Sequence, residues 1–164
     1  MWITRLALAD QGDTEDMTPS IDIIPDQPLA DDAALLAFAR FLHDGVTPRR
    51  RTLWLVLLDG ERRPLPVIVP VDHVPEEPEP LMVSNLGRAW SEILLGEPDA
   101  SVLLMLERPG PAEPSLGDHA WRAALHAVAA EHGLRLAGFF LATADGVRPL
   151  PGSHVSGAAP TPRR

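Results

Sequence analysis

The amino-acid sequence predicts an α/β protein in which helices cover both faces of a mixed sheet, a three-layer α/β/α arrangement. Apolar runs of strand length alternate along the chain with longer segments that carry apolar residues at helical spacing. Two of these runs are almost entirely apolar, which is typical of strands buried on both faces. A tight turn at Asp59-Gly60 joins the first two strands, which are therefore expected to be antiparallel in an otherwise partly parallel sheet.

The first half of the predicted domain consists of a helix and a β-hairpin. Asp31 and Asp32 favour a helix start because acidic side chains stabilise the positive end of the helix dipole, and Gly45 favours its end. Pro66 and Pro70 cannot donate backbone hydrogen bonds, so the second strand is expected at an edge of the sheet. The expected elements are a helix over 31–44, a strand over 52–59 and a strand over 65–71.

The second half alternates helices with strands. Ser84 is expected to cap one helix that ends before Gly96, and Ser115 to start another that ends before Gly133 with Trp121 in the core. The inward positions expected in the first of these helices are Leu86, Trp90, Ile93 and Leu94. The expected elements are a helix over 85–95, a strand over 101–106, a helix over 115–132 and strands over 134–143 and 147–150.

The chain is expected to contain one domain with a polar extension on each side. Residues 1–30 are predicted to be a partly ordered acidic lead-in, residues 31–150 the single α/β domain, and residues 151–164 a flexible tail rich in Gly, Ser, Pro and Ala. The first ten residues are charged too early for a secretory signal, and no apolar run approaches the roughly 20 residues of a membrane helix. We therefore expect a cytoplasmic protein.

The composition narrows the classes of partner and chemistry. A net charge of −9 argues against non-specific binding of nucleic acid or of an anionic membrane, since both need a basic surface. The absence of cysteine excludes disulfides, thiol nucleophiles and Cys-ligated zinc. We therefore expect no nucleic-acid or membrane partner. An unidentified protein partner remains open, as does the oligomeric state.

The order of the later elements resembles a known domain. The strand ending in Leu57-Leu-Asp59 is followed by a helix, a buried strand over 100–106, a Pro/Gly loop with Pro114-Ser-x-x-Asp118, a long helix and the strand over 134–143. This layout resembles the JAB (JAMM/MPN-like) domain of RadC-like proteins, which has a cytidine-deaminase-like architecture. The resemblance covers about residues 51–150 and implies that architecture here.

The residues that bind zinc in that family are largely missing from this chain. In the family, two His of a His-x-His and the Asp of Ser-x-x-Asp bind zinc, and a Glu before the first strand activates the zinc-bound water. Here the His-x-His position falls on Leu106-Glu-Arg108 and the Glu position falls near Arg51, so that only Ser115 and Asp118 match. The resemblance therefore implies a catalytically silent domain that needs no metal or other cofactor.

Five polar residues are candidates for binding a polar ligand or a partner at the strand ends, where open α/β sheets bind ligands: Arg51, Glu107, Arg108, Ser115 and Asp118. Each also has a purely structural interpretation. Ser115 and Asp118 have the spacing of a helix capping box, and Glu107 and Arg108 are typical of a solvated surface ion pair.

Three hypotheses follow for the function. The favoured one is a metal-free JAB-like binding or scaffold module in a bacterial cytoplasm. The second is a metal-dependent hydrolase of the isopeptidase or peptidase type, with rearranged ligands such as Asp118, His119 and Glu107. The third is an unrelated α/β domain with a small-molecule site at the strand ends.

Overall fold

Helices and strands follow one another in the predicted order in a computed structural model, which describes residues 26–97 and 99–152. The elements are α1 (Asp32–His43), β1 (Thr52–Leu58), β2 (Pro64–Asp72), α2 (Pro80–Ile93), β3 (Ser101–Glu107), α3 (Leu116–Glu131), β4 (Arg135–Thr143) and β5 (Gly146–Pro149). The strands form one five-stranded sheet in the order β2-β1-β3-β4-β5. Strands β3 and β4 are parallel, and the other neighbours are antiparallel.

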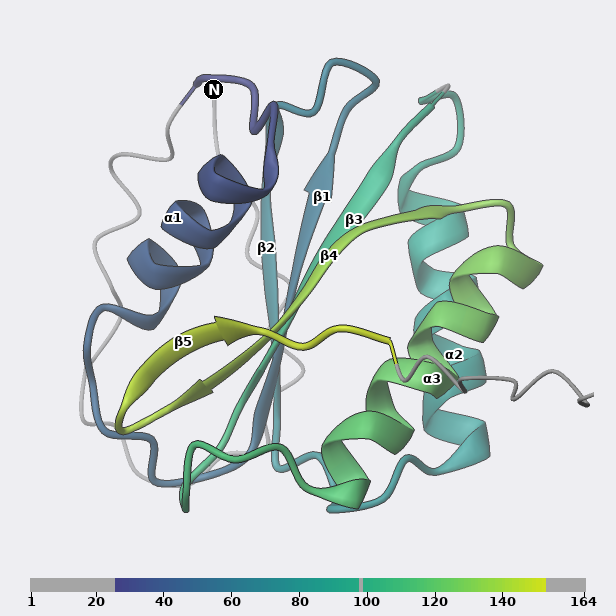
Figure 1. Ribbon diagram of the computed structural model, residues 1–164. Helices are drawn as coiled ribbons and strands as arrows, with labels where there is room; N and C mark the ends of the chain where they lie inside the picture. The colour runs from purple at the N-terminus through teal and green to yellow at the C-terminus, as the bar shows by residue number, and fades with distance from the viewer. Residues whose placement is uncertain (1–25, 98, 153–164) are drawn as a thin grey trace, which may run out of the picture.

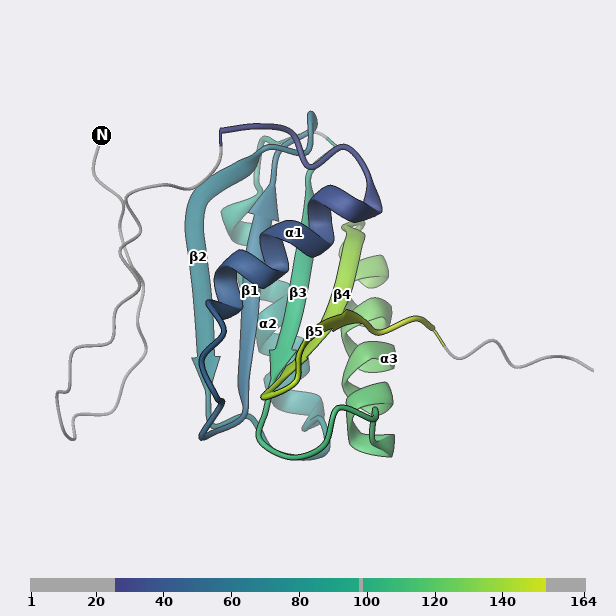
Figure 2. The same cartoon turned by 60° about the vertical axis from the view of Figure 1, so that its left-hand side comes forward.

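The sheet lies between two helical layers. Helix α1 covers one face, and α2 and α3 lie side by side on the other (Figure 1; Figure 2). Each face has its own apolar core, one built with Leu35 and Phe38 of α1 and the other with Trp90 of α2 and Trp121 of α3. The prediction of an α/β fold with a mixed sheet is confirmed.

The central strands β1 and β3 are buried on both faces, as predicted, and their side chains alternate between the two cores. In β3, Leu104 and Leu106 pack toward α2 and α3, whereas Leu103 and Met105 pack toward α1. This alternation decides where the charged residues at the end of the strand point. The Glu107 side chain points to the face that α1 covers, and the Arg108 side chain points to the face that α3 covers.

Helix α2 begins earlier than predicted. Its first residue is Pro80 and its N-cap is Glu79, so Ser84 is an exposed residue inside the helix and caps nothing. Proline suits the first helical position because its φ is already helical and its missing N–H has no partner there. The inner face also differs from the prediction, because Ile93 is 46% exposed. The buried positions of the helix are Val83, Gly87 and Trp90.

Strand β2 lies at an edge, as its prolines predict. Trp54 pairs with Pro70 across the ladder. Because a proline cannot donate to β1, this must be a pair without direct hydrogen bonds, and the missing N–H of Pro70 lies on the outer side. Pro64 pairs with Leu58 in the same ladder, so its missing N–H also lies on the outer side, whereas Pro66 lies in the stretch where the register shifts. The free edge of β2 therefore lacks two of its donors. Such an edge is a poor template for a further strand.

We expect the replacement of Pro64 and Pro70 by valine to make the protein self-associate, since it restores two donors on the free edge. Light scattering coupled to size-exclusion chromatography at increasing concentration measures the effect. A double variant that stays the size of the wild type at every concentration would contradict the edge argument. Pro78→Val, in the loop after β2, is the control.

The described part of the chain also bears on two further expectations. None of its helices is both long enough and apolar enough to cross a membrane. Leu29, within the predicted acidic lead-in, is buried in the core beneath α1, and its N–H donates to the Arg62 carbonyl at 2.9 Å. Residues 1–25 and 153–164, which include most of that lead-in and of the predicted tail, lie outside the described residues.

Candidate functional site

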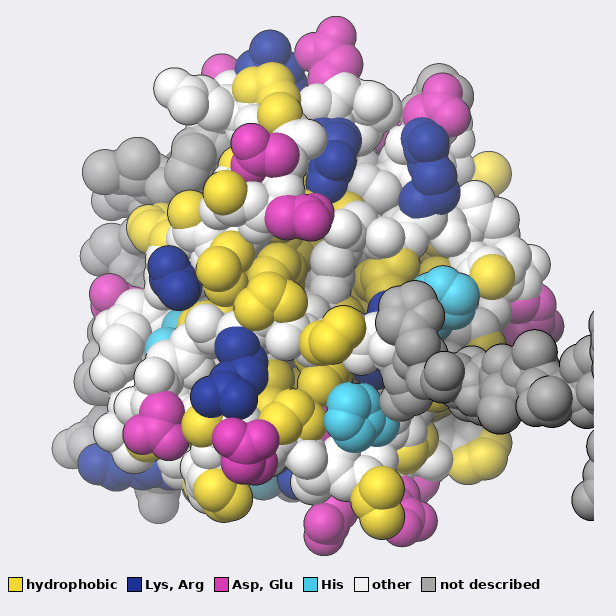
Figure 3. All heavy atoms as spheres, in the orientation of Figure 1, with side chains coloured by type: hydrophobic (Ala, Val, Ile, Leu, Met, Phe, Trp, Pro, Cys, Tyr) yellow, Lys and Arg dark blue, Asp and Glu magenta, His cyan; other side chains and the backbone are white. Residues whose placement is uncertain are grey.

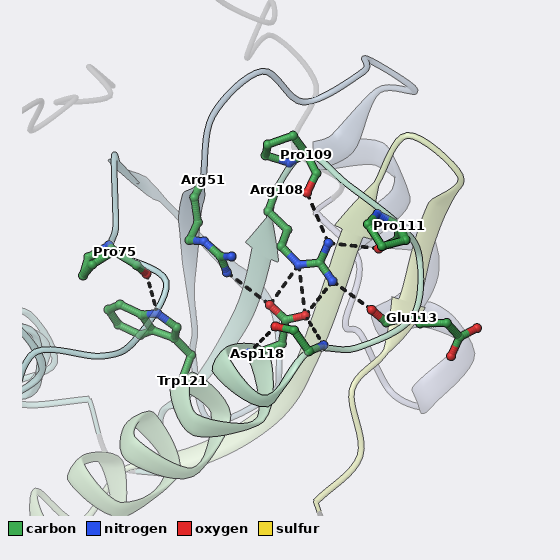
Figure 4. A network of polar contacts seen from close by, with 9 residues as sticks. Arg51, Pro75, Arg108, Pro109, Pro111, Glu113, Asp118 and Trp121 are labelled. Carbon is green, nitrogen blue, oxygen red and sulfur yellow. Dashed lines mark hydrogen bonds and ion pairs between the residues drawn. The ribbon is translucent and has the colours of Figure 1, made fainter.

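The candidate site lies where β3 ends and α3 begins, and it is centred on Arg108 (Figure 4). The Arg108 side chain is only 5% exposed and extends toward the first turn of α3. Its Nε lies 2.9 Å from both carboxylate oxygens of Asp118, and its Nη2 donates to Asp118 Oδ2 at 2.7 Å. This forked contact matches the planar guanidinium to the planar carboxylate.

The remaining donors of Arg108 hold the loop that follows it. Nη1 donates to the carbonyl oxygens of Pro109 at 3.2 Å and Pro111 at 2.9 Å, and Nη2 donates to that of Glu113 at 3.0 Å. The loop over 109–114 therefore curls around the guanidinium (Figure 4). Arginine has five N–H donors, and these contacts engage all three of its nitrogens.

Asp118 accepts hydrogen bonds from three residues, and its side chain is fully buried. Besides Arg108, Arg51 Nη1 donates to Oδ1 at 3.1 Å and the Ser115 backbone N–H donates to Oδ2 at 2.8 Å. Burial raises the pKa of this carboxyl, but the hydrogen bonds of Arg108, Ser115 and Arg51 and the charge of Arg108 together lower the pKa below its ordinary value of 3.8. Asp118 is therefore ionised at neutral pH.

The lowered pKa of Asp118 predicts how stability depends on pH. A carboxyl whose pKa is lower in the folded state contributes stability above its unfolded pKa, and this contribution is lost as the pH falls through the folded pKa. We therefore expect the difference in unfolding free energy between the wild type and Asp118→Asn to shrink below about pH 4. Urea unfolding between pH 7 and pH 2.5 tests this, with the exposed Asp145→Asn as control. A difference that stays constant over this range would contradict the pKa argument.

Ser115 and Asp118 form the predicted capping box. The Asp118 N–H donates to Ser115 Oγ at 3.2 Å, and the Asp118 carboxylate accepts the Ser115 N–H in return. This box starts α3 and also fixes the carboxylate against Arg108.

Loss of the Ser115 hydroxyl removes one of the two hydrogen bonds of the box. We expect Ser115→Ala to lower the free energy of unfolding by about 1 kcal/mol. Urea denaturation measures the loss, and Ser84→Ala is the matched control because Ser84 is exposed inside α2 and caps nothing. Equal stability of the Ser115→Ala variant and the wild type would contradict the capping role.

Contacts from the loop between β2 and α2 hold the start of α3 in place. The Trp121 indole N–H donates to the Pro75 carbonyl at 2.9 Å (Figure 4). A Cβ at Gly117 would lie 2.5 Å from the Glu76 carbonyl oxygen, so only glycine permits this approach. Neither contact can be predicted from local sequence patterns, because both join segments more than 40 residues apart along the chain.

The structure brings four of the five candidate residues together and separates the fifth. Arg51, Arg108, Ser115 and Asp118 share one network, whereas Glu107 turns to the other face of the sheet, where its carboxylate lies 2.8 Å from His43 Nδ1 and accepts its N–H. The interpretation of Glu107 and Arg108 as a solvated surface pair is wrong. Adjacent strand residues point to opposite faces, and each of these two has a buried or half-buried partner on a different helix.

The chemistry available to this network is limited. Both Asp118 oxygens already accept hydrogen bonds from charged donors, which leaves the carboxylate no room to bind a metal ion or to take up a proton at neutral pH. Among residues 26–97 and 99–152, no group of three or more His, Cys, Asp or Glu side chains is placed to hold a metal. Arg51, Arg108, Ser115 and Asp118 therefore do not fit a zinc site.

The face of the molecule shown in Figure 3 gives no single strong signal for a partner. On the face in Figure 3, basic and acidic side chains are scattered among apolar ones, without a large region of one sign among the described residues. Comparison of the chain with protein-family models, curated proteins and solved structures found no match.

Proposed function

We propose that this protein is a metal-free, catalytically silent domain of the JAB-like type that acts as a binding or scaffold module in a bacterial cytoplasm. The observation that carries the proposal is the pairing of Arg108 with Asp118. In the resemblance, Asp118 matches the carboxylate ligand of zinc and Arg108 falls on the second His position. The guanidinium thus supplies the positive charge beside Asp118 that a metal ion supplies in the family.

The contacts of Arg108 with the 109–114 loop favour a binding role for this domain over the loss of all function. The Arg108 guanidinium holds three carbonyls of the 109–114 loop and so fixes the backbone of a segment in which Pro109, Gly110, Pro111 and Glu113 are exposed. A loop held in one conformation binds a partner at a lower entropic cost than a flexible one. We propose this loop as the contact surface for a protein partner.

Metal analysis of the purified protein tests the first part of the proposal. We expect no stoichiometric zinc to remain after incubation with zinc and dialysis, in the wild type or in Asp118→Ala. Stoichiometric zinc in the wild type that is lost in Asp118→Ala would overturn the proposal and favour the hydrolase hypothesis. Asp145→Ala is the matched control, because Asp145 is exposed in the turn between β4 and β5.

The hydrolase with rearranged ligands has less support. Its proposed ligands Asp118, His119 and Glu107 would have to converge, but Glu107 pairs with His43 beside α1 and Asp118 is engaged by two arginines. His119 lies on α3 next to Asp118, and its buried Nδ1 has no partner among the described residues. One imidazole without further free ligands does not make a catalytic zinc site.

The hypothesis of an unrelated α/β domain predicts a small-molecule site at the carboxyl ends of the strands. In this structure that end of β3 is filled by the Arg108 side chain and the loop around it. Because residues of the chain itself occupy this end of β3, the structure favours the scaffold proposal over a small-molecule site there.

A further inference from the structure

A pocket of about 530 Å³ lies at the opposite end of the sheet from Asp118, where α2 and α3 end and β3 and β4 begin. This volume is in the range of small-molecule sites, which run from about 300 to 1,000 Å³. Its apolar wall is formed by Leu94, Leu95, Ala100 and Leu134. Leu95 is 79% exposed, so an apolar surface is available to a ligand there.

Two helices direct their negative ends to this pocket. Because α2 precedes β3, α3 precedes β4, and these strands are parallel, both helices end at the same end of the sheet (Figure 1). Each helix carboxyl end acts as about half a negative charge. Neither α2 nor α3 has a basic residue in its last turn, whereas α1 has Arg40 and His43 in its own. The last turns of α2 and α3 therefore lack the cation that commonly offsets a helix end, although the C-cap residue of α3, His132, lines the pocket.

The charged side chains of the pocket add to the negative potential. Glu97 and Asp99 line it, and both are exposed. Arg135 also lines it, but its Nη2 donates to the Asp99 carbonyl oxygen at 2.8 Å and to Asp99 Oδ1 at 3.1 Å. Glu97 forms no ion pair among the described residues. The Glu97 carboxylate thus has no paired cation, and the cation-capable side chains that line the pocket are Arg135, held by Asp99, and His132.

We propose that this pocket binds a guanidinium or ammonium group carried on an aliphatic chain. The cationic head would lie near Glu97 and the helix carbonyls, and the aliphatic part would pack on Leu95 and Leu134. Two sources have this chemistry: a free small molecule, or an Arg or Lys side chain on a peptide. The pocket is separate from the Arg108–Asp118 network, so a negative binding result at the pocket would leave the proposed function intact.

Titration of the full ¹⁵N-labelled chain with capped arginine, N-acetyl-arginine methylamide, tests the proposal. We expect backbone amide shifts at residues 94–97, 99–100 and 132–135, with a Kd on the order of 1 mM and weaker binding as salt screens the charges. Capped citrulline has nearly the same shape without the charge, and we expect it to leave these signals unchanged. A short peptide, Gly-Gly-Arg-Gly-Gly, separates the sources: at least tenfold tighter binding indicates a peptide ligand, and equal binding indicates a small molecule.

Three variants define which groups bind. Glu97→Gln is expected to weaken the binding of capped arginine about threefold, since it removes one exposed ion pair. Ser91→Arg places a guanidinium of the chain itself in the pocket and is expected to abolish binding, with a circular dichroism spectrum that verifies the fold. Glu77→Gln, an exposed carboxylate in the loop before α2, is expected to bind like the wild type.

Three outcomes would overturn the proposal. These are equal shifts with citrulline and arginine, shifts confined to residues outside the pocket, and equal affinity of the Glu97→Gln and Glu77→Gln variants.

Discussion

Replacement of Arg108 by alanine is expected to lower the free energy of unfolding by about 3–5 kcal/mol at neutral pH, the usual cost of breaking a buried ion pair by removing one partner. The side chains of Arg108 and Asp118 are 5% and 0% exposed, so the carboxylate left behind has little access to water. Arg51 retains only one contact with it, at 3.1 Å. Urea denaturation of the variant and the wild type measures the loss.

Two further variants separate charge from shape. Arg108→Lys keeps the charge but loses the planar fork, so it is expected to be intermediate in stability between the wild type and Arg108→Ala. The double variant Arg108→Ala/Asp118→Ala is expected to be at least as stable as Arg108→Ala, because it also removes the uncompensated carboxylate. Simple additivity of the two single losses would show that the two side chains do not act as a pair.

The backbone of this fold could largely be predicted from local patterns. Apolar runs predict β1 and β3, prolines predict an edge for β2, and the Ser115–Asp118 spacing predicts the box that starts α3. Each of these signals is local, acting over a few residues. The wrong start of α2 has the same origin, since Ser84 and Pro80 are both local helix-start signals and the proline prevailed.

The site was less predictable because its contacts join distant segments. Arginine and glutamate are rarely buried, so composition favours an exposed position for Glu107 and Arg108. Their partners are set by the alternation of the strand and by which helix covers each face. His43 lies 64 residues from Glu107, and Arg51 lies 67 residues from Asp118. The sequence therefore indicates which polar residues lie near the end of β3 and the start of α3, but their pairing depends on the three-dimensional arrangement of α1, β3 and α3.

Replacement of Trp121 by alanine is expected to cost about 3–5 kcal/mol of unfolding free energy, because the side chain is completely buried beside the sheet. The loss combines a cavity in the core with the loss of the hydrogen bond from the indole N–H to the Pro75 carbonyl at 2.9 Å. Trp121→Phe separates these terms, since it keeps most of the apolar volume and lacks the N–H. We expect it to lose much less stability than Trp121→Ala.

The hydrogen bond from Trp121 to Pro75 is also expected to link the core to the candidate site, because it joins the loop before α2 to α3, the helix that carries Asp118. Hydrogen exchange at residues 74–79 measures this link separately from global stability. Trp121→Phe should speed exchange there, through loss of the donor to Pro75, while exchange in β1 stays near that of the wild type. Unchanged exchange in the loop of Trp121→Phe would show that the packing around Gly117 is enough to hold the loop. A Trp121→Ala variant with nearly the unfolding free energy of the wild type would contradict the core position of this helix face.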